Sequence, residues 1–260
     1  MPAERPIVEF RDVVKKFNGS PVLDGLSFSV SKGEIFCIVG PSGTGKSVTL
    51  RHLVRLVSPT SGSVFVDGVD VAAASDRELV AVRRRIGYLF QSGALLAWMT
   101  VAENVALPLR ETTRLKEGEI AAKTAAALAA VELSAAADKF PSQISGGMQK
   151  RAGLARAIVR DSDIMLYDEP TSGLDPVTAA TIHRLIVKIG RERGITSIVV
   201  THDLASALDF ADRILLLKDG KAVACLPPAE FARSANPVVR EFVSAAVSPS
   251  VRPIDEVRNR

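Results

Sequence analysis

The sequence predicts an α/β fold with a mainly parallel sheet. It contains short, continuous apolar runs typical of buried strands, helical segments between these runs, and a glycine-rich loop after one of them. The clearest runs are EIFCIVG (34–40), IGYLF (86–90) and IMLYDEP (164–170). Strands that alternate with helices favour a parallel sheet, because parallel strands need a crossover connection.

The first third of the chain is predicted to begin with two strands, IVEFRDVV and VLDGLSFSV, separated by the turn signal NGSP at 18–21. After the run at 34–40, a helix is expected from about Gly45 to Val57. The segment SPTSG then breaks the chain before a further strand, SVFVDG, and a helical stretch near 76–85.

Residues 92–160 differ from the flanking sequence. KEGEIAAKTAAALAAVEL is rich in alanine and helix-forming, with leucine and valine at positions that can form a packing stripe. We therefore predict a helical insertion in the sheet domain.

The α/β pattern returns after the run at 164–170. Ile182, Leu185, Ile186 and Ile189 follow the spacing i, i+3, i+4, i+7 of one buried helix face. TSIVVTHD, RILLLKDG and KAVACL are predicted strands, and NPVVREFVSAAV is a predicted terminal helix. We expect residues 1–245 to form one domain, and the polar tail at 246–260 to be mobile or to bind a partner.

The loop GPSGTGKS (40–47) matches the phosphate-binding pattern G-x-x-x-x-G-K-[ST] between a predicted strand and a predicted helix. Glycines let backbone N–H groups turn inward around phosphates. Lys46 is expected to reach the β- and γ-phosphates, and Ser47 to bind Mg²⁺. The alternative is a chance glycine-rich turn, which the flanking strand and helix disfavour.

Polar side chains end three of the apolar runs. Asp168 and Glu169 follow IMLY at the carboxyl end of a strand, where ligands collect in open α/β sheets. Asp168 suits Mg²⁺, and Glu169 suits the activation of a water for attack on the γ-phosphate. His202 in VVTHD is placed to contact the γ-phosphate, although a lone histidine is more often structural. Gln91 in IGYLFQ is placed to bind Mg²⁺ or orient water.

ISGGMQKRAGLARAI (144–158) reads as a serine and two glycines that open a basic amphipathic helix. A helix N-terminus of this kind suits an anion, so the chain carries a second phosphate cradle. A helical insertion can present this cradle to the nucleotide of another copy. We therefore predict a head-to-tail dimer with two shared ATP sites, which responds to ATP binding and hydrolysis.

In this order, GPSGTGKS, Gln91, ISGGM, IMLYDEP, SGLD (172–175) and His202 resemble the motifs of the nucleotide-binding subunit of ABC transporters, over residues 7–245. The resemblance implies a RecA-like P-loop NTPase core with an N-terminal antiparallel β subdomain and an inserted α-helical subdomain. It also implies that Glu169 is the catalytic base and His202 the switch histidine, and that the signature segment contacts the opposite subunit's γ-phosphate. Phe17 matches the place of the aromatic residue that stacks on adenine, and Asp175 that of a residue at the dimer seam. The implied ATP-contacting residues are Phe17, Gly40, Pro41, Ser42, Gly43, Thr44, Gly45, Lys46, Ser47, Val48, Ser145, Gly146, Gly147, Met148 and Asp175, and the implied Mg²⁺ ligands are Ser47, Gln91 and Asp168.

The sequence departs from the family pattern at three of these positions. Met148 replaces the usual glutamine of the signature, Phe17 stands where tyrosine is commoner, and Val48 stands where threonine is frequent. The change at Val48 removes one hydroxyl contact to phosphate. None of these changes predicts an inactive site.

The segment SGALLAWMTVAENVALPLRE (92–111) places Leu95, Leu96, Trp98 and Met99 beside the expected active site. These residues either pack the helical insertion or form a groove near 92–105 for an apolar helix of a membrane partner. The sequences of this segment and of SGGMxKRAGLARAI are similar to the corresponding segments of ATPases of the maintenance-of-lipid-asymmetry (Mla) type. That resemblance implies ATP hydrolysis coupled to phospholipid transport between inner and outer membranes, with a permease, an MCE-domain lipid-binding protein and a small cytosolic regulatory protein as partners.

Three other functions remain open. An importer ATPase for an amino acid or another small solute would share every ABC motif. A soluble ABC ATPase that acts on DNA or ribosomes is disfavoured by the single cassette and by the absence of sustained heptads. A GTPase-like switch would give ISGGM and His202 no role, and no guanine-reading Asn-Lys-x-Asp stretch is present.

Bulk composition limits the partners and the location. The net charge of +4 is too small and too dispersed to predict binding to nucleic acid. Cys37 and Cys225 lie in apolar, strand-like runs and are expected to be buried free thiols. No apolar run is long enough to span a bilayer, and the N-terminus has charges where a signal peptide is apolar. We expect a peripheral protein on the cytoplasmic side of the inner membrane, attached through its partner.

Overall fold

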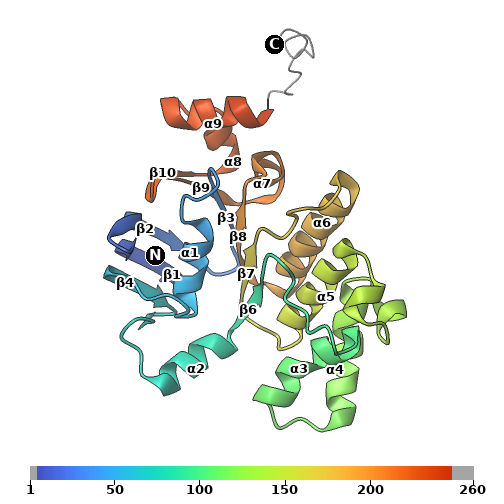
Figure 1. Cartoon of the computed structure of the whole chain (residues 1–260). Helices are drawn as coiled ribbons and strands as arrows, with labels where there is room; N and C mark the ends of the chain where they lie inside the picture. The colour runs from blue at the N-terminus through green and yellow to red at the C-terminus, as the bar shows by residue number, and fades with distance from the viewer. Residues whose placement is uncertain (1–4, 248–260) are drawn as a thin grey trace, which may run out of the picture.

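The computed structural model describes residues 5–247. It contains two β-sheets and a group of helices that lies on the far side of the larger sheet from the smaller one (Figure 1). The predicted α/β class with a mainly parallel sheet is confirmed, as is the insertion of helices between the strands β6 and β7. Most of the predicted tail, residues 248–260, lies outside the described residues.

The smaller sheet is antiparallel, with strand order β2-β1-β4-β5. Its strands are β1 (Val8–Phe17), β2 (Ser20–Val30), β4 (Ser61–Val66) and β5 (Val69–Asp70). A tight turn joins β1 to β2 through Asn18 and Gly19, both at positive φ, which these two residue types tolerate. Phe10 and Phe28 stack beneath this sheet with ring centroids 4.5 Å apart. This strand order pairs β1 with β4, which is distant in the sequence. The apolar pattern of the sequence alone therefore does not predict the strand order.

The larger sheet has six strands in the order β10-β9-β3-β8-β7-β6 and is parallel except at β10. The strands are β3 (Ile35–Val39), β6 (Ile86–Leu89), β7 (Ile164–Asp168), β8 (Thr196–Thr201), β9 (Arg213–Lys218) and β10 (Lys221–Leu226). All residues of β3, β7 and β8 are buried, as expected for strands with both faces covered. The carboxyl ends of β3, β8, β7 and β6 therefore meet at one edge, which is where the site forms.

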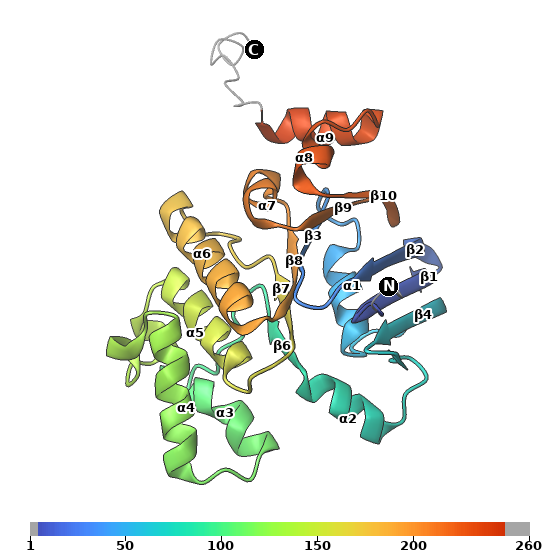
Figure 2. The ribbon, with the colours of Figure 1, turned by 180° about the vertical axis from the view of Figure 1, so that it is seen from behind.

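The helical insertion consists of α3 (Val101–Thr112), α4 (Glu117–Ala130) and α5 (Gly146–Ile158), with short 3₁₀ turns between α4 and α5. Figure 2 shows these helices grouped with α6 on one side of the molecule. Thr100 and Glu103 form a capping box that fixes the start of α3. The alanine-rich α4 packs against α3 and α5 through buried residues such as Ile120 and Leu128.

The remaining helices are α1 (Lys46–Leu53), α2 (Asp76–Arg84), α6 (Pro176–Arg193), α7 (Leu204–Phe210), α8 (Pro228–Ala232) and α9 (Pro237–Val247). The predicted buried face of α6 is confirmed, since Ile182, Leu185, Ile186 and Ile189 are all buried. The helix predicted to reach Val57 ends at Leu53. Both cysteines are free, as expected, but only Cys37 is fully buried, because Cys225 lies on the edge strand β10. Within residues 5–247, no helix is both long and apolar enough to cross a membrane.

Candidate nucleotide-binding site

The phosphate loop connects β3 to α1 and curls around its own lysine. Lys46 Nζ donates hydrogen bonds to the carbonyl oxygens of Gly40 and Pro41, each at 2.9 Å. Gly45 precedes α1 at φ +94°, where a Cβ would lie 2.8 Å from a methyl carbon of Leu23. Burial lowers the pKa of Lys46, with Glu169 and Asp168 opposing that shift. A buried cation inside a ring of backbone groups suits a polyphosphate.

The carboxylates at the end of β7 face this loop. Ser47 Oγ donates to Asp168 Oδ1 at 2.6 Å, and Tyr88 Oη lies 3.3 Å from the other oxygen of Asp168. Glu169 Oε1 lies 3.9 Å from Lys46 Nζ. The paired hydroxyl and carboxylate oxygens of Ser47 and Asp168 fit a Mg²⁺ ion, which prefers hard oxygen ligands.

Glu169 adopts a left-handed backbone conformation, with φ +49°. Non-glycine residues rarely adopt this conformation, and such strain is concentrated at functional sites. Its N–H donates to the carbonyl of Val200 at 2.9 Å, so the turn is tied to the neighbouring strand β8. The conformation turns the Glu169 side chain toward the phosphate loop and His202.

His202 and Gln91 complete one wall of the pocket. His202 Nδ1 lies 2.7 Å from Glu169 Oε2, and most of the imidazole is exposed. Gln91 Nε2 lies 3.4 Å from Ser172 Oγ. The pocket has a volume of about 360 Å³ and is lined by Val22, Ser42, Gly43, Gly45, Lys46, Ser47, Val48, Gln91, Glu169, Ser172 and His202. The structure thus brings the phosphate loop together with all three predicted catalytic residues.

The signature segment lies outside this pocket. Ser145 caps α5 by accepting a hydrogen bond from the Met148 N–H at 3.3 Å. Gly146 faces open space, whereas a Cβ on Gly147 would overlap Thr178 of α6. None of the predicted nucleotide contacts at 145–148 lines the phosphate pocket of the same chain. Ser145 and Gly146 are exposed, so this end of α5 is accessible from outside the chain.

Asp175 and Phe17 also lie outside the lining of the phosphate pocket. Asp175 caps α6 and accepts from the backbone N–H of Val177 and Thr178 and from the Thr178 hydroxyl. These hydrogen bonds lower the pKa of Asp175. Phe17 is 44% exposed at the end of β1, with Lys15 Nζ 4.8 Å from its ring centroid. An exposed ring at this position is free to stack on a planar base.

Sequence reasoning missed two polar groups of the site, Tyr88 and Lys150. The apolar run IGYLF gives Tyr88 the appearance of a core residue, yet its hydroxyl reaches Asp168. Lys150 lies in the predicted basic amphipathic helix, yet only 7% of it is exposed. A basic residue one turn after a helix start gives no local signal that its side chain turns inward.

The class of protein that this fold and site define is the ATP-binding cassette ATPase. The model of the ABC transporter family matches residues 23–172, which include the phosphate loop, the signature and the two carboxylates. The chain therefore belongs to the ABC transporter family.

Particular relatives extend this finding. The chain is 42% identical to the probable ribonucleotide transport ATP-binding protein mkl of Mycobacterium tuberculosis H37Rv, over 91% of this chain and 66% of mkl, just under two thirds of that relative. It is 39% identical to the intermembrane phospholipid transport system ATP-binding protein MlaF of Escherichia coli K12, over 91% of this chain and 88% of MlaF. It is 42% identical to the methionine import ATP-binding protein MetN of Caulobacter vibrioides, over 92% of this chain and 73% of MetN.

A solved structure shares the fold. The dimeric, post-hydrolysis structure of the ATP-binding cassette MJ0796, bound to ADP and Pi, matches with a TM-score of 0.78 and 36% identity. The match covers 85% of this chain and 98% of MJ0796. The predicted ABC fold and the predicted ATPase class are confirmed by these similarities.

Proposed function

We propose that two copies of this chain bind ATP and Mg²⁺ at a shared interface, close head to tail, and hydrolyse ATP to drive a membrane transporter. The observation that carries the proposal is the split of phosphate-binding elements. One chain assembles the phosphate loop with Glu169, His202 and Gln91, while its cradle at Ser145–Gly147 lies outside that pocket. The dimeric cassette MJ0796 supports pairing of this kind.

Each residue then has a role set by its place. Lys46 and the loop amides bind the phosphates, and Ser47, Asp168 and Gln91 would hold Mg²⁺, which neutralises phosphate charge when bound. Glu169 orients and deprotonates the attacking water, because its carboxylate is aimed at the loop by a strained turn. His202 is positioned by Glu169 to contact the γ-phosphate. Ser145, Gly146 and Gly147 of the other copy close over that phosphate, with Asp175 at the seam and Phe17 stacked on adenine.

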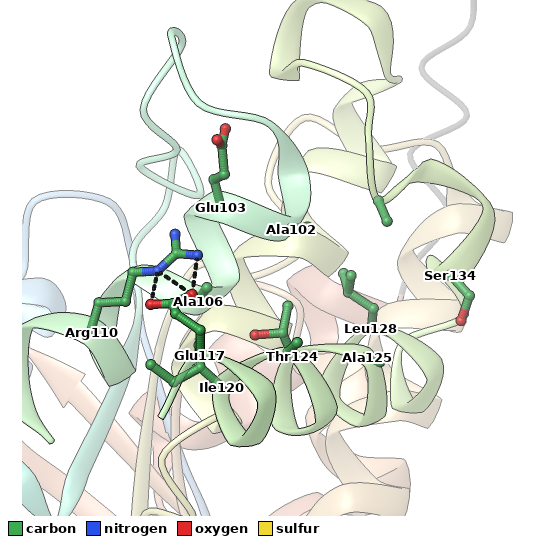
Figure 3. A pocket seen from close by; sticks show the side chains of 12 residues that line it. Ala102, Glu103, Ala106, Arg110, Glu117, Ile120, Thr124, Ala125, Leu128 and Ser134 are labelled. Carbon is green, nitrogen blue, oxygen red and sulfur yellow. Dashed lines mark hydrogen bonds and ion pairs between the residues drawn. The ribbon is translucent and has the colours of Figure 1, made fainter. Parts of the chain in front are cut away.

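A permease helix is proposed to dock in the pocket between α3 and α4. This pocket has a volume of about 270 Å³ and an apolar floor that includes Ala106 and Leu128 (Figure 3). The ion pair between Arg110 and Glu117, at 2.8 Å, lies at its rim. The hydroxyl oxygen of Thr124 is buried in the pocket without a hydrogen-bond partner among the described residues. An apolar helix would cover the floor of the pocket, and one polar side chain on that helix would supply a hydrogen-bond partner for Thr124.

Trp98 extends the proposed docking surface beyond the pocket. It is 72% exposed, so it does not pack the helical insertion. Its sequence neighbours Leu95, Leu96 and Met99 are half-buried, and Leu95 packs against the hydrophobic core. Large exposed aromatic residues are typical anchors of protein interfaces. The groove expected at 92–105 is thus proposed to combine Trp98 with the α3–α4 pocket.

The proposed cargo is phospholipid, moved between the inner and outer membranes with an MCE-domain lipid-binding protein and a small cytosolic regulatory protein. The similarity of the whole chain to MlaF supports this cargo, as does the resemblance of residues 92–111 and of the signature helix to Mla-type sequences. The chain would then lie on the cytoplasmic side of the inner membrane as a peripheral subunit. The second candidate is an importer ATPase for a small solute, which the 42% identity to MetN supports.

The domain boundaries remain part of the proposal. We propose residues 1–245 as the nucleotide-binding domain, with residues 92–160 as its helical subdomain. The tail at 246–260 is proposed to reach the neighbouring subunit and stabilise the dimer. Its deletion is expected to weaken ATP-dependent dimerisation, measured by sedimentation. Unchanged dimerisation and unchanged ATP hydrolysis would contradict this role.

The test of the function uses the variant Glu169→Gln, which is expected to bind ATP and remain in the closed dimer. The tagged variant is extracted from native membranes in mild detergent with ATP, and bound proteins and lipids are identified by mass spectrometry. A permease with an MCE-domain protein and phospholipid is the expected result. Recovery of a permease with a soluble solute-binding protein would contradict the phospholipid cargo and support the import of a small solute. Normal ATP turnover in this variant would refute the role of Glu169.

A further inference from the structure

The signature helix α5 carries three basic side chains that bind backbone carbonyl groups, and a fourth, Arg160, follows just after its end. Lys150 contacts Gln91, and Arg156 donates to the carbonyls of Gly93 and Ala94 at 2.8 and 2.7 Å. The other two are Arg151 and Arg160, which donate to carbonyls at 131–132 and at 83 and 86. The basic character of this helix therefore serves internal contacts, and its basic residues are used to hold neighbouring loops.

The segment from Gln91 to Ala94 is clamped onto α5 at two points. Lys150 binds its first carbonyl, and Arg156 binds the carbonyls of Gly93 and Ala94. A Cβ on Gly153 would lie 3.1 Å from the Gly93 carbonyl oxygen, so the backbones of α5 and this segment approach closely. The segment that carries Gln91 is therefore held against α5 by side-chain and backbone contacts.

Lys150 also reaches the end of β7. Its ammonium nitrogen lies 3.5 Å from the carbonyl oxygen of Glu169. Among residues 5–247, no carboxylate oxygen lies within ion-pair distance of this nitrogen. Burial of a cation without a paired anion is costly, and backbone carbonyls compensate only part of the cost. Its desolvation lowers the pKa of Lys150, while the charges of Glu169 and Asp168 raise it.

We propose that Lys150 is a positioning residue for ATP hydrolysis, because its ammonium group joins the signature helix to the backbones of Gln91 and Glu169. Ser145 and Gly146 at the start of α5 are exposed and face the other copy in the proposed dimer, whereas Gln91 and Glu169 serve the nucleotide of their own chain. Lys150 thus links the contact made across the dimer to the geometry of hydrolysis within the subunit. This inference rests on the proposed role of Glu169.

The backbone of Glu169 explains why such a link affects the carboxylate. At φ +49° the residue is held in a conformation that non-glycine residues rarely adopt, and the direction of its side chain follows from that backbone. Its carbonyl accepts from the Ser172 N–H at 3.2 Å and lies near Lys150. Loss of the lysine removes one of these two contacts. A displacement of a fraction of an ångström at a catalytic base lowers the rate without removing the nucleotide contacts.

The test compares Lys150→Met with Lys150→Arg and Lys150→Gln in the full chain. Methionine keeps the length and removes the donor, and we expect kcat for ATP hydrolysis to fall on the order of tenfold to a hundredfold. KM for ATP and ATP-dependent dimerisation are expected to change less than about threefold, since the phosphate loop and the signature stay intact. Arginine or glutamine, which retain N–H donors, are expected to recover part of the rate.

A matched control is Lys123→Met. Lys123 lies on α4 in the same helical insertion and forms an exposed ion pair with Asp161 at 2.6 Å. We expect this variant to retain the wild-type kcat, because exposed ion pairs contribute little to stability. A kcat for Lys150→Met within about twofold of the Lys123→Met value would overturn the inference, as would failure of both donor-retaining variants to exceed methionine. Turnover in Glu169→Gln would instead refute the proposed role of Glu169 on which the inference rests.

Discussion

The two signature glycines are expected to differ sharply when each is replaced by alanine. A Cβ on Gly147 would overlap the methyl carbon of Thr178, well inside the 3.0 Å that real Cβ atoms respect. Thr178 cannot rotate away freely, because its hydroxyl donates to Asp175 at 2.6 Å. Gly146, one residue earlier in the same helix, has no atom within 4 Å of the corresponding Cβ.

The magnitude follows from these contacts. Overpacking costs about 1–3 kcal/mol, and replacing a helical glycine by alanine returns up to about 1 kcal/mol. Gly147→Ala is therefore expected to lower the free energy of unfolding by about 1–2 kcal/mol, and Gly146→Ala to leave it unchanged or slightly higher. Thr178→Ser removes the overlapping methyl and keeps the hydroxyl bond to Asp175. In combination with Gly147→Ala it should restore about 1–2 kcal/mol, measured as the coupling energy of a double-mutant cycle.

The assay is urea unfolding of the nucleotide-free protein, followed by far-ultraviolet circular dichroism. In the absence of ATP the signature glycines have no nucleotide to contact, so only their packing within the chain is measured. Equal destabilisation by the two alanine variants would refute the packing argument. So would a coupling energy near zero between positions 147 and 178.

Three further predictions concern the nucleotide and the partner. Ser47→Ala should abolish most Mg²⁺-dependent hydrolysis and leave nucleotide affinity in EDTA nearly unchanged, because Ser47 contributes an oxygen beside Asp168; an equal loss of affinity in EDTA would contradict this role. Burial lowers the pKa of Lys46, so its positive charge is lost at a lower pH than that of an exposed lysine. ATP affinity, measured by equilibrium binding, should therefore fall as the pH rises into the alkaline range. If the affinity of the wild type changed no more with pH than that of Lys46→Ala, the result would argue against this prediction. Trp98→Ala should preserve the ATPase rate of the isolated chain and reduce recovery of the permease from membranes, and the fluorescence of this single tryptophan should shift to shorter wavelength when the permease binds. An unchanged recovery and spectrum would exclude Trp98 from the interface.

Much of the sheet was predictable from sequence because its strands are buried on both faces. IFCIV and IMLYD are continuous apolar runs for that reason, and the residues that follow them lie at the carboxyl edge, where the pocket forms. The position of Glu169, His202 and Gln91 around one pocket follows from the same rule. Their contacts do not, because the 2.7 Å approach of His202 to Glu169 depends on a strained turn that no local pattern encodes.

The helical insertion was predictable only in outline. Alanine-rich sequence indicates a helix, but the pocket between α3 and α4 depends on how the two helices pack. The sequence predicts α5 to be a basic amphipathic helix, but it does not predict that Lys150 and Arg156 turn inward to backbone carbonyls. The sequence shows that a side chain is charged. Whether that side chain faces solvent depends on the backbone carbonyl groups that the fold places near it.

The strand that leads into the phosphate loop has a further consequence for how the chain is made. β3 is hydrogen-bonded on one side to β8 and on the other to β9, with Ile35 opposite Ser197 and Phe36 opposite Arg213. Both partners are synthesised long after β3 leaves the ribosome. The nascent chain therefore holds a complete phosphate-loop sequence without a sheet to support it, and ATP cannot stabilise the growing polypeptide. We expect this sheet to form only after β8 and β9 have been synthesised, with apolar β3 in need of protection from aggregation until then.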